Sequence, residues 1–313
     1  MRMLEAWKNL DTELKVVIIS AGTSFLIFII GWLIKSLHDK YSFNYKLKRE
    51  YMFKQQKNIQ EEIAKTKTLL LNSSEEVNYR LWNFIFNISE NWHSIEESKW
   101  LESKHYYLRS FVYRILVFIF WILETEKSIL SFDSTVANKK DNYYLKFVKT
   151  FKHIFCDIRI LKELDYENNS VSNHFYANEL PSYAKYVSNN NGGVIDYDEF
   201  YEKAKKDYSK INKLFIYINE MTDNENDKNW NVLRCYHLLI LEFLNNFGHD
   251  YQKTNKKKMK FIFDKYKTIK IKKGFYEFIK KNKIEKKLKS VINGIYEQSR
   301  FKRFVFAITF GKL

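Results

Sequence analysis

The feature that most constrains this chain is an uncharged run at residues 16–34, VVIISAGTSFLIFIIGWLI, which a basic segment follows at once. Nineteen residues of helix at 1.5 Å each measure about 28 Å, close to the roughly 30 Å hydrocarbon thickness of a bilayer. A cleaved signal peptide has a shorter apolar region and a small-residue cleavage site, whereas this run ends with GWLI before Lys35. It therefore predicts a retained transmembrane helix, with the core helix of a soluble domain as the alternative.

Basic residues on the two sides of the run predict its orientation. The first 15 residues carry three basic and three acidic side chains, whereas five basic side chains follow the run within 15 positions. They are Lys35, Lys40, Lys46, Lys48 and Arg49. Because the side richer in Lys and Arg stays in the cytoplasm, we expect a single-pass protein with its N-terminus outside and a cytoplasmic C-terminal domain. The Lys, Asn and Ile bias indicates a bacterium, and hence its inner membrane.

Small residues within the run favour self-association. Ser20 and Ser24 are four residues apart, and Gly31 lies one heptad after Ser24 on the same helical face. Such a face lets helices pack closely in lipid, so it predicts a homo-oligomer, with chance as the alternative.

A second apolar run, ILVFIFWIL at residues 115–123, lies between Arg114 and Glu124. Nine residues are too few to cross a bilayer, so we expect a buried helix and one transmembrane segment in all. Arg109 and Arg114 would need polar partners if they point into the core.

The rest of the chain predicts an all-α fold. Pro181 is the only proline, so helices can run long, and an aromatic content of 18% can fill a large core. Apolar residues recur at helical spacing in five segments, 77–92, 101–126, 142–164, 203–221 and 230–247, whereas no segment alternates long enough to indicate a sheet. The sequence NSSEE at 72–76 resembles the N-cap of the first bundle helix.

These features predict five regions along the chain. They are a short extracytoplasmic N-terminus (1–15), a transmembrane helix (16–34), a juxtamembrane polar stalk helix (35–73), a cytosolic helical domain (74–250) and a basic helical tail (251–313).

The positive charge is concentrated in the tail. Residues 252–313 hold 20 Lys and Arg against four Asp and Glu, which equals the whole net charge of +16. Aromatic residues lie between these cations, as in proteins that bind nucleic acid or the anionic inner leaflet of the bilayer; a solvated surface is the alternative. The candidate binding residues are Lys256, Lys257, Lys258, Lys272, Lys273, Lys280, Lys281, Lys286 and Lys287.

Two segments have the residue types of metal sites. NNNGGVIDYDEF at 189–200 resembles half a calcium loop, but Asp196 as an N-cap with Glu199 three residues later requires fewer assumptions. His153 and Asp157 have a chelating spacing, near Cys156 and His174. We expect structural roles for all of these residues and no cofactor.

Motifs of known enzymes are missing from the sequence. No Arg is followed by His at the spacing of HEPN-type ribonucleases, and no phosphate-binding loop, dinucleotide fingerprint or nucleophile elbow occurs. Arg234, His237 and Glu242 share a predicted helix with Asn245 and Asn246, where we expect hydrogen bonds between helices. An enzyme is therefore less favoured than a binding protein.

Three phrases, NYRLWNFIFN, YYLRSFVYRILVFIFWI and FCDIRILKELDYENNSVSNHFYANEL, resemble a family of uncharacterised bacterial proteins with one N-terminal membrane helix and a helical domain. The likeness covers roughly residues 75–185 and implies no activity. The layout is similar to membrane effectors of bacterial anti-phage systems. It implies an effector of abortive infection that oligomerises and perturbs the inner membrane when a nucleic acid or a defence protein signals. A membrane-tethered nuclease of unfamiliar motif and a passive scaffold are the alternatives.

A reporter assay tests the predicted topology. Green fluorescent protein fused after Leu313 should fluoresce and alkaline phosphatase there should be inactive, because the C-terminus stays in the cytoplasm. Residues 1–40 should carry a soluble reporter into the membrane fraction. A soluble 1–40 fusion, or periplasmic access to a tag at Leu313, would contradict the prediction.

Overall fold

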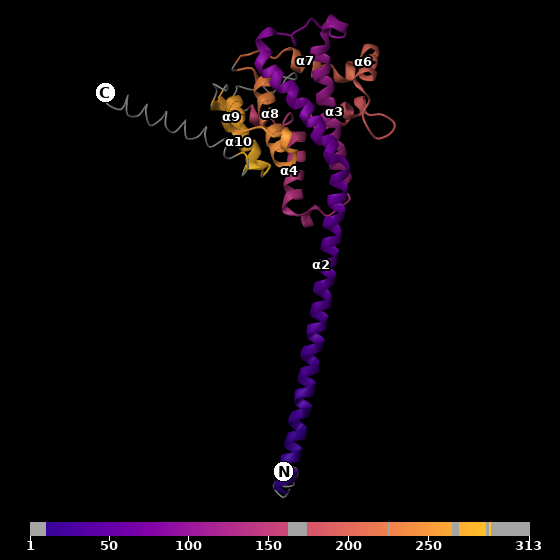
Figure 1. Cartoon of the computed structure of the whole chain (residues 1–313), viewed down its shortest axis with the longest axis vertical. Coiled ribbons are helices and arrows are strands. Elements are labelled where there is room, and N and C mark those ends of the chain that lie inside the picture. The colour runs from indigo at the N-terminus through magenta and orange to yellow at the C-terminus, as the bar shows by residue number, and fades with distance from the viewer. Residues whose placement is uncertain (1–10, 162–173, 225, 265–268, 286–287, 289–313) are drawn as a thin grey trace, which may run out of the picture. The chain divides into compact units, whose positions relative to one another are not determined.

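The computed structural model describes residues 11–161, 174–224, 226–264, 269–285 and 288. The chain divides into two compact units, residues 1–57 and 58–313. The described residues form helices and no β-strand, with one isolated bridge between Ser188 and Val194 (Figure 1). The prediction of an all-α fold is confirmed.

Helix α2 (Thr12–Asn87) begins with the apolar run and is continuous for 76 residues. The most apolar window of this helix has none of its residues buried. The segment Ser103–Ile129 is also long and apolar enough to cross a membrane, but 67% of its window is buried inside the protein. The start of α2 is therefore a candidate membrane span whose apolar side chains meet no protein core.

The predicted helix start at residues 72–76 is wrong, because α2 continues through them. The hydroxyl of Ser73 donates to the Leu70 carbonyl at 3.0 Å, and that of Ser74 donates to the Leu71 carbonyl at 2.7 Å. Serine hydroxyls can bond to the preceding turn of their own helix as well as cap a new one. Here both serines are buried in mid-helix.

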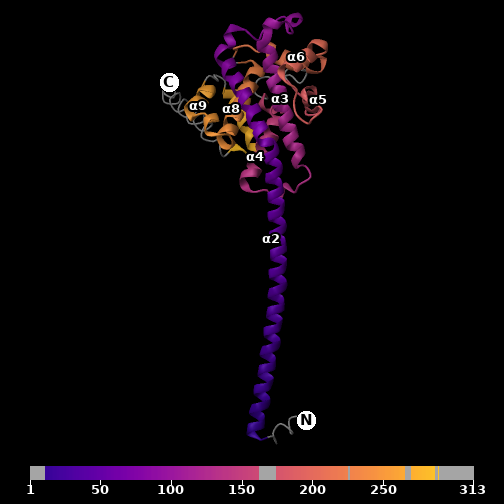
Figure 2. The same ribbon diagram turned by 45° about the vertical axis from the view of Figure 1, so that its right-hand side comes forward.

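The second unit is a bundle in which α3 packs against α4, α5, α6 and α7, and α4 packs against α8 (Figures 1 and 2). The helices of the bundle are α3 (Tyr106–Ile129), α4 (Lys139–His153), α5 (Leu180–Val187), α6 (Tyr197–Lys206), α7 (Asn212–Asn219), α8 (Lys228–Phe247), α9 (Lys256–Asp264) and α10 (Ile269–Lys281). Short 3₁₀ helices connect them: η1 (Ile88–Glu90), η2 (Glu97–Lys99), η3 (Ser103–His105), η4 (Ser134–Val136), η5 (Ile158–Ile160), η7 (Ser209–Ile211) and η8 (Asp250–Gln252). Since 17 of the 20 residues of α8 are buried, this helix is the centre of the core.

Side-chain caps set where several of these helices begin. Asn138 accepts from the backbone N–H of Asp141 before α4, and Asp227 accepts from that of Trp230 before α8. The Asp196 carboxylate accepts from Glu199 N at 2.8 Å, so the predicted N-cap of α6 is confirmed. Helix ends were predicted less well. The helix predicted at 142–164 corresponds to α4, which ends at His153, and the helix predicted at 203–221 is divided between α6 and α7.

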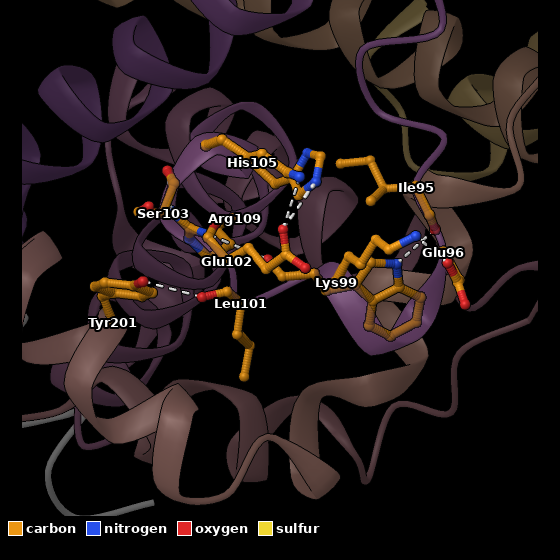
Figure 3. A network of polar contacts seen from close by, with 11 residues as sticks. Ile95, Glu96, Lys99, Leu101, Glu102, Ser103, His105, Arg109 and Tyr201 are labelled. Atoms are coloured by element: carbon orange, nitrogen blue, oxygen red, sulfur yellow. Dashed lines mark hydrogen bonds and ion pairs between the residues drawn. The ribbon is translucent and has the colours of Figure 1, made fainter.

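Helix α3 contains the second apolar run and is largely buried, together with Arg109. The Arg109 guanidinium donates to the backbone carbonyls of Trp100 (3.2 Å), Glu102 and Ser103 (3.1 Å), and it lies over the Tyr201 ring (Figure 3). The Tyr201 hydroxyl donates to the Leu101 carbonyl at 2.9 Å. These contacts join the α2–α3 connection to α6.

Arg114 also has the partner that its position requires. Its Nε donates to Glu76 Oε2 at 3.0 Å, which forms an ion pair between α3 and α2. The expectation that both arginines find polar partners is confirmed.

Candidate functional site

A groove lies between α2 and α9, with a volume of about 450 Å³. Trp82 and Phe86 of α2 form one wall, and Lys257, Lys258 and Phe261 of α9 form the other. We call it the α2–α9 groove. It brings residues of the predicted basic tail together with aromatic rings from a segment some 170 residues earlier in the sequence.

The aromatic side chains of the groove form a stacked series. The ring centroids of Trp82 and Phe86 are 5.9 Å apart at an interplanar angle of 18°, and those of Phe86 and Phe261 are 5.8 Å apart at 28°. Trp82 and Phe86 are four residues apart on α2, a spacing that places side chains on one helical face. Phe86 is 60% exposed and Phe261 is 39% exposed, so the stacked series lies at the protein surface.

Hydrogen bonds at the end of α8 position α9 beside α2. Asn245 Nδ2 donates to the Thr254 carbonyl at 3.0 Å, and Thr254 N donates back to Asn245 Oδ1 at 2.7 Å. Gln252 Nε2 donates to Glu75 Oε2 of α2 at 2.7 Å. Since Met259 and Ile262 are buried, the opposite face of α9, with Lys257, Lys258 and Phe261, is turned outward.

His237 supports Trp82 from inside the protein. The two rings meet edge to face with centroids 4.8 Å apart, and His237 Nε2 lies 2.9 Å from Asn78 Oδ1. Complete burial lowers the pKa of His237 to about 3, so the imidazole is neutral at pH 7. The neutral ring donates from Nε2 to the amide oxygen, which joins α8 to α2.

The other polar residues of α8 also have structural contacts. Arg234 lies over the Trp230 ring at 4.3 Å and pairs with Asp223 at 3.5 Å. Asn246 Nδ2 donates to Glu242 Oε1 at 2.7 Å. The expected hydrogen bond between helices is confirmed for His237, whereas Arg234, Glu242 and Asn246 have partners within α8 or in the loop before it.

The nine predicted binding lysines fall into three sets. Lys256, Lys257 and Lys258 are exposed on α9, and none of them pairs with a carboxylate among the described residues. Lys272, Lys273, Lys280 and Lys281 belong to α10. Lys286 and Lys287 lie outside the described residues.

Helix α10 packs against η5, and one of its lysines pairs with a carboxylate beside η5. A Cβ atom at Gly274 would lie 2.6 Å from the Ile160 carbonyl oxygen, so only glycine permits this close approach. Lys281 lies 3.6 Å from Asp157. Among the seven of these lysines that the structure describes, Lys257 and Lys258 line the groove with aromatic rings.

Trp82 and Phe86 were missed by sequence reasoning, although the sequence holds a signal for them. The core stripe of this helix is carried by Leu81, Phe84 and Ile85, all of which are buried. Trp82 and Phe86 are apolar residues off that stripe, one helical turn apart. Large apolar residues outside a core face indicate a contact surface.

The small residues of the predicted span, Ser20, Ser24 and Gly31, are exposed in α2. A Cβ atom at Gly31 would meet nothing within 4 Å. The packing of these positions against a second copy stays a prediction.

Asp157 and Asn189, which belong to the two possible metal sites, have other contacts. No group of three or more His, Cys, Asp or Glu among the described residues is arranged to hold a metal ion. Asp157 accepts from Arg159 Nε at 2.7 Å, and burial raises the pKa of the Cys156 thiol to about 11. In the loop before α6, Asn189 Oδ1 accepts from the backbone N–H groups of Asn191 and Gly193.

No family model matches the chain, and neither a curated protein nor a solved structure shows significant similarity to it. The resemblance over residues 75–185 therefore stays a prediction from the sequence.

Burial of His237 predicts a pH dependence of stability. Its pKa is near 6.5 in the unfolded chain and about 3 in the folded protein, so the unfolded state binds the extra proton between these values. The stabilisation is complete above pH 6.5 and decreases as the pH falls toward 3, by at most about 1.4 kcal/mol per pH unit. Urea unfolding of the detergent-solubilised chain at several pH values, followed by tryptophan fluorescence, measures this slope.

His237→Gln should flatten that slope, because glutamine cannot titrate. His38→Gln, at an exposed histidine of α2, is the matched control and should leave the slope unchanged. Equal slopes in wild type and His237→Gln would contradict the assignment.

Proposed function

We propose that this chain is a single-pass protein of the bacterial inner membrane whose helical domain binds single-stranded nucleic acid in the α2–α9 groove. On this proposal the protein is a membrane effector, and the bound nucleic acid is its activating signal. One observation carries the proposal: Trp82, Phe86 and Phe261 form a stacked aromatic series at the surface beside Lys257 and Lys258, which pair with no described carboxylate.

Single strands are the nucleic acids that this chemistry suits. Stacking a base on an aromatic ring is worth about 1–3 kcal/mol and is possible with every base, but only when the base is unpaired. Lysines beside the rings contact phosphates and make binding dependent on salt. A lipid headgroup has the charge for the lysines but no planar ring for the stack, so the groove favours nucleic acid over the anionic leaflet.

The membrane part of the proposal rests on burial. In α2 the most apolar window has 0% of its residues buried, so lipid is the environment that its side chains require. The apolar window of Ser103–Ile129 is 67% buried, which supports one span and not two. Ser20, Ser24 and Gly31 would allow copies of the span to pack together.

The effector output and its place in anti-phage defence come from the layout of the sequence. On this proposal, nucleic acid bound at the groove promotes oligomers of the span that perturb the membrane. A membrane-tethered nuclease would bind the same nucleic acid but would cleave RNA or DNA instead of perturbing the membrane. A passive scaffold would do neither.

Binding of a fluorescent 20-nucleotide oligo(dT) by the full chain in nanodiscs of neutral lipid tests the groove. Lys257→Gln/Lys258→Gln should weaken binding. It should also make the negative slope of log K against log salt shallower by about 1.4, because two phosphate contacts are lost. Phe86→Leu should weaken binding about tenfold with an unchanged slope, because a stacking surface is lost while the charges remain.

Two matched variants control for this test. Lys139→Gln/Lys140→Gln removes two exposed lysines of α4, and Trp92→Leu removes an exposed ring outside the groove; both should bind as wild type. Unchanged binding in the groove variants would overturn the proposal. Soluble dihexanoyl phosphatidylglycerol that binds the wild type but not these variants, without oligonucleotide binding, would favour lipid instead.

Expression in a bacterial host tests the membrane output. The wild type should depolarise the inner membrane, as measured with a potential-sensitive dye. Ser24→Lys or Phe28→Lys should abolish the effect, because a charge at the bilayer centre opposes insertion and packing. Ser36→Lys, beyond the uncharged run, should retain it.

RNA and DNA integrity in the same cells separates the alternatives. Degraded nucleic acid with a normal membrane potential would favour the tethered nuclease. Normal potential with intact nucleic acid would favour the scaffold.

A further inference from the structure

A second site lies away from the groove, in a cavity of about 730 Å³ formed by α5, α6 and η7. Its size is within the range of small-molecule sites. Four lysines line it: Lys185 of α5, Lys203 and Lys206 of α6, and Lys210 of η7. We call it the α5–α6 cavity.

The two carboxylates of the cavity are already engaged by the protein. Glu179 Oε2 accepts from Tyr176 N at 3.0 Å and pairs with Lys213 at 3.2 Å. Asp207 Oδ1 accepts from Ser209 N at 2.8 Å, and hydrogen bonds from the side chain and the backbone of Ser209 lower the pKa of this carboxyl group. Neither carboxylate forms a close ion pair with a lysine of the cavity wall, although the charge of Lys210 also helps to lower the pKa of Asp207 from a longer distance.

The lysines differ in how they are held. Lys203 Nζ donates to the Tyr186 carbonyl at 2.5 Å and lies 4.7 Å from the centre of the Tyr186 ring. Among the described residues, no carboxylate pairs with Lys185, Lys206 or Lys210. The wall therefore carries three cations without an ion pair beside a fourth that is held in place.

Helix dipoles account for part of this arrangement. Lys203 and Lys206 are in the last turn of α6 and Lys185 is in the last turn of α5, where cations are favoured. The helix dipoles do not explain Lys210, because it belongs to neither helix. They also do not explain why the four lysines line the same cavity. Bringing like charges together costs free energy unless an anion compensates them.

The walls beside the lysines are joined by a hydrogen bond and are partly apolar. The Tyr186 hydroxyl donates to the Asp207 carbonyl at 2.7 Å, which ties α5 to the end of α6. Tyr183 is almost completely buried and lines the cavity with Ser182 and Asn178, which offer neutral hydrogen-bond donors. Lysines with neutral donors are the usual recognition groups for phosphate oxygens.

From this placement we infer that the α5–α6 cavity binds a small molecule that carries two or more phosphate groups, with Lys185, Lys206 and Lys210 as the anion-binding residues and Lys203 as a fixed part of the wall. Phosphate groups of this kind occur both in nucleotides and in inorganic polyphosphate. The inference is independent of nucleic-acid binding at the groove, since the two sites share no residue.

Isothermal titration of the full chain in neutral-lipid nanodiscs with ATP, inorganic triphosphate, AMP and adenosine tests the inference. Both triphosphates should bind, AMP should bind at least tenfold more weakly, and adenosine should not bind. Tighter binding of ATP than of inorganic triphosphate would identify nucleotides as the ligand, whereas equal binding would identify the phosphate chain alone. Lys206→Gln/Lys210→Gln should weaken binding of both triphosphates at least tenfold.

Both lysines are exposed and form no ion pair with a described carboxylate, so their replacement by glutamine should change the stability of the fold little. Lys139→Gln/Lys140→Gln has the same change of charge and should bind triphosphate as wild type. Equal binding by wild type and Lys206→Gln/Lys210→Gln, or no binding of either triphosphate below 1 mM, would overturn the inference. Oligo(dT) binding by this variant should remain unchanged, which separates failure here from failure at the groove.

Discussion

The hydrogen bond between His237 Nε2 and Asn78 Oδ1 orients the α2 wall of the α2–α9 groove. It joins the most buried helix of the bundle to α2, and burial in a low dielectric makes it stronger than the same bond in water. Asn78 lies one turn before Trp82, so the bond also fixes the rotation of α2 about its axis. With that rotation fixed, Trp82 rests on the His237 ring and Phe86 follows one turn later toward α9.

Local patterns in the sequence predicted local structure well. The segment 230–247 agrees with α8 within two residues, and Asp196 caps α6 as expected, because helical periodicity and capping depend on nearby residues. The NSSEE segment shows where this reasoning ends. The same serines can cap a new helix or bond within an existing one, and burial of Leu71 and Val77 on either side decides for the continuous helix.

The groove could be predicted only in part. The lysines of 256–258 and the off-stripe position of Trp82 and Phe86 are visible in the sequence, but nothing local indicates that they meet. Their meeting depends on the bond between Gln252 and Glu75 and on the reciprocal pair of Asn245 and Thr254, which turns the chain from α8 into α9. Single contacts between residues so distant in the sequence leave no periodic trace.

The distribution of charge shows a further limit of sequence reasoning. The whole net charge of +16 falls in residues 252–313, whereas acidic and basic residues balance in the rest of the chain. Yet the α5–α6 cavity, with its four lysines, lies in that balanced part of the chain. The lysines there lack close ion pairs because the two carboxylates of the cavity are engaged by backbone N–H groups and by Lys213. At physiological ionic strength a charge acts over about 8 Å, so the local balance around each cation determines where a phosphate can bind. The net charge of a segment is therefore a poor guide to binding sites unless one knows which carboxylates the fold has already used.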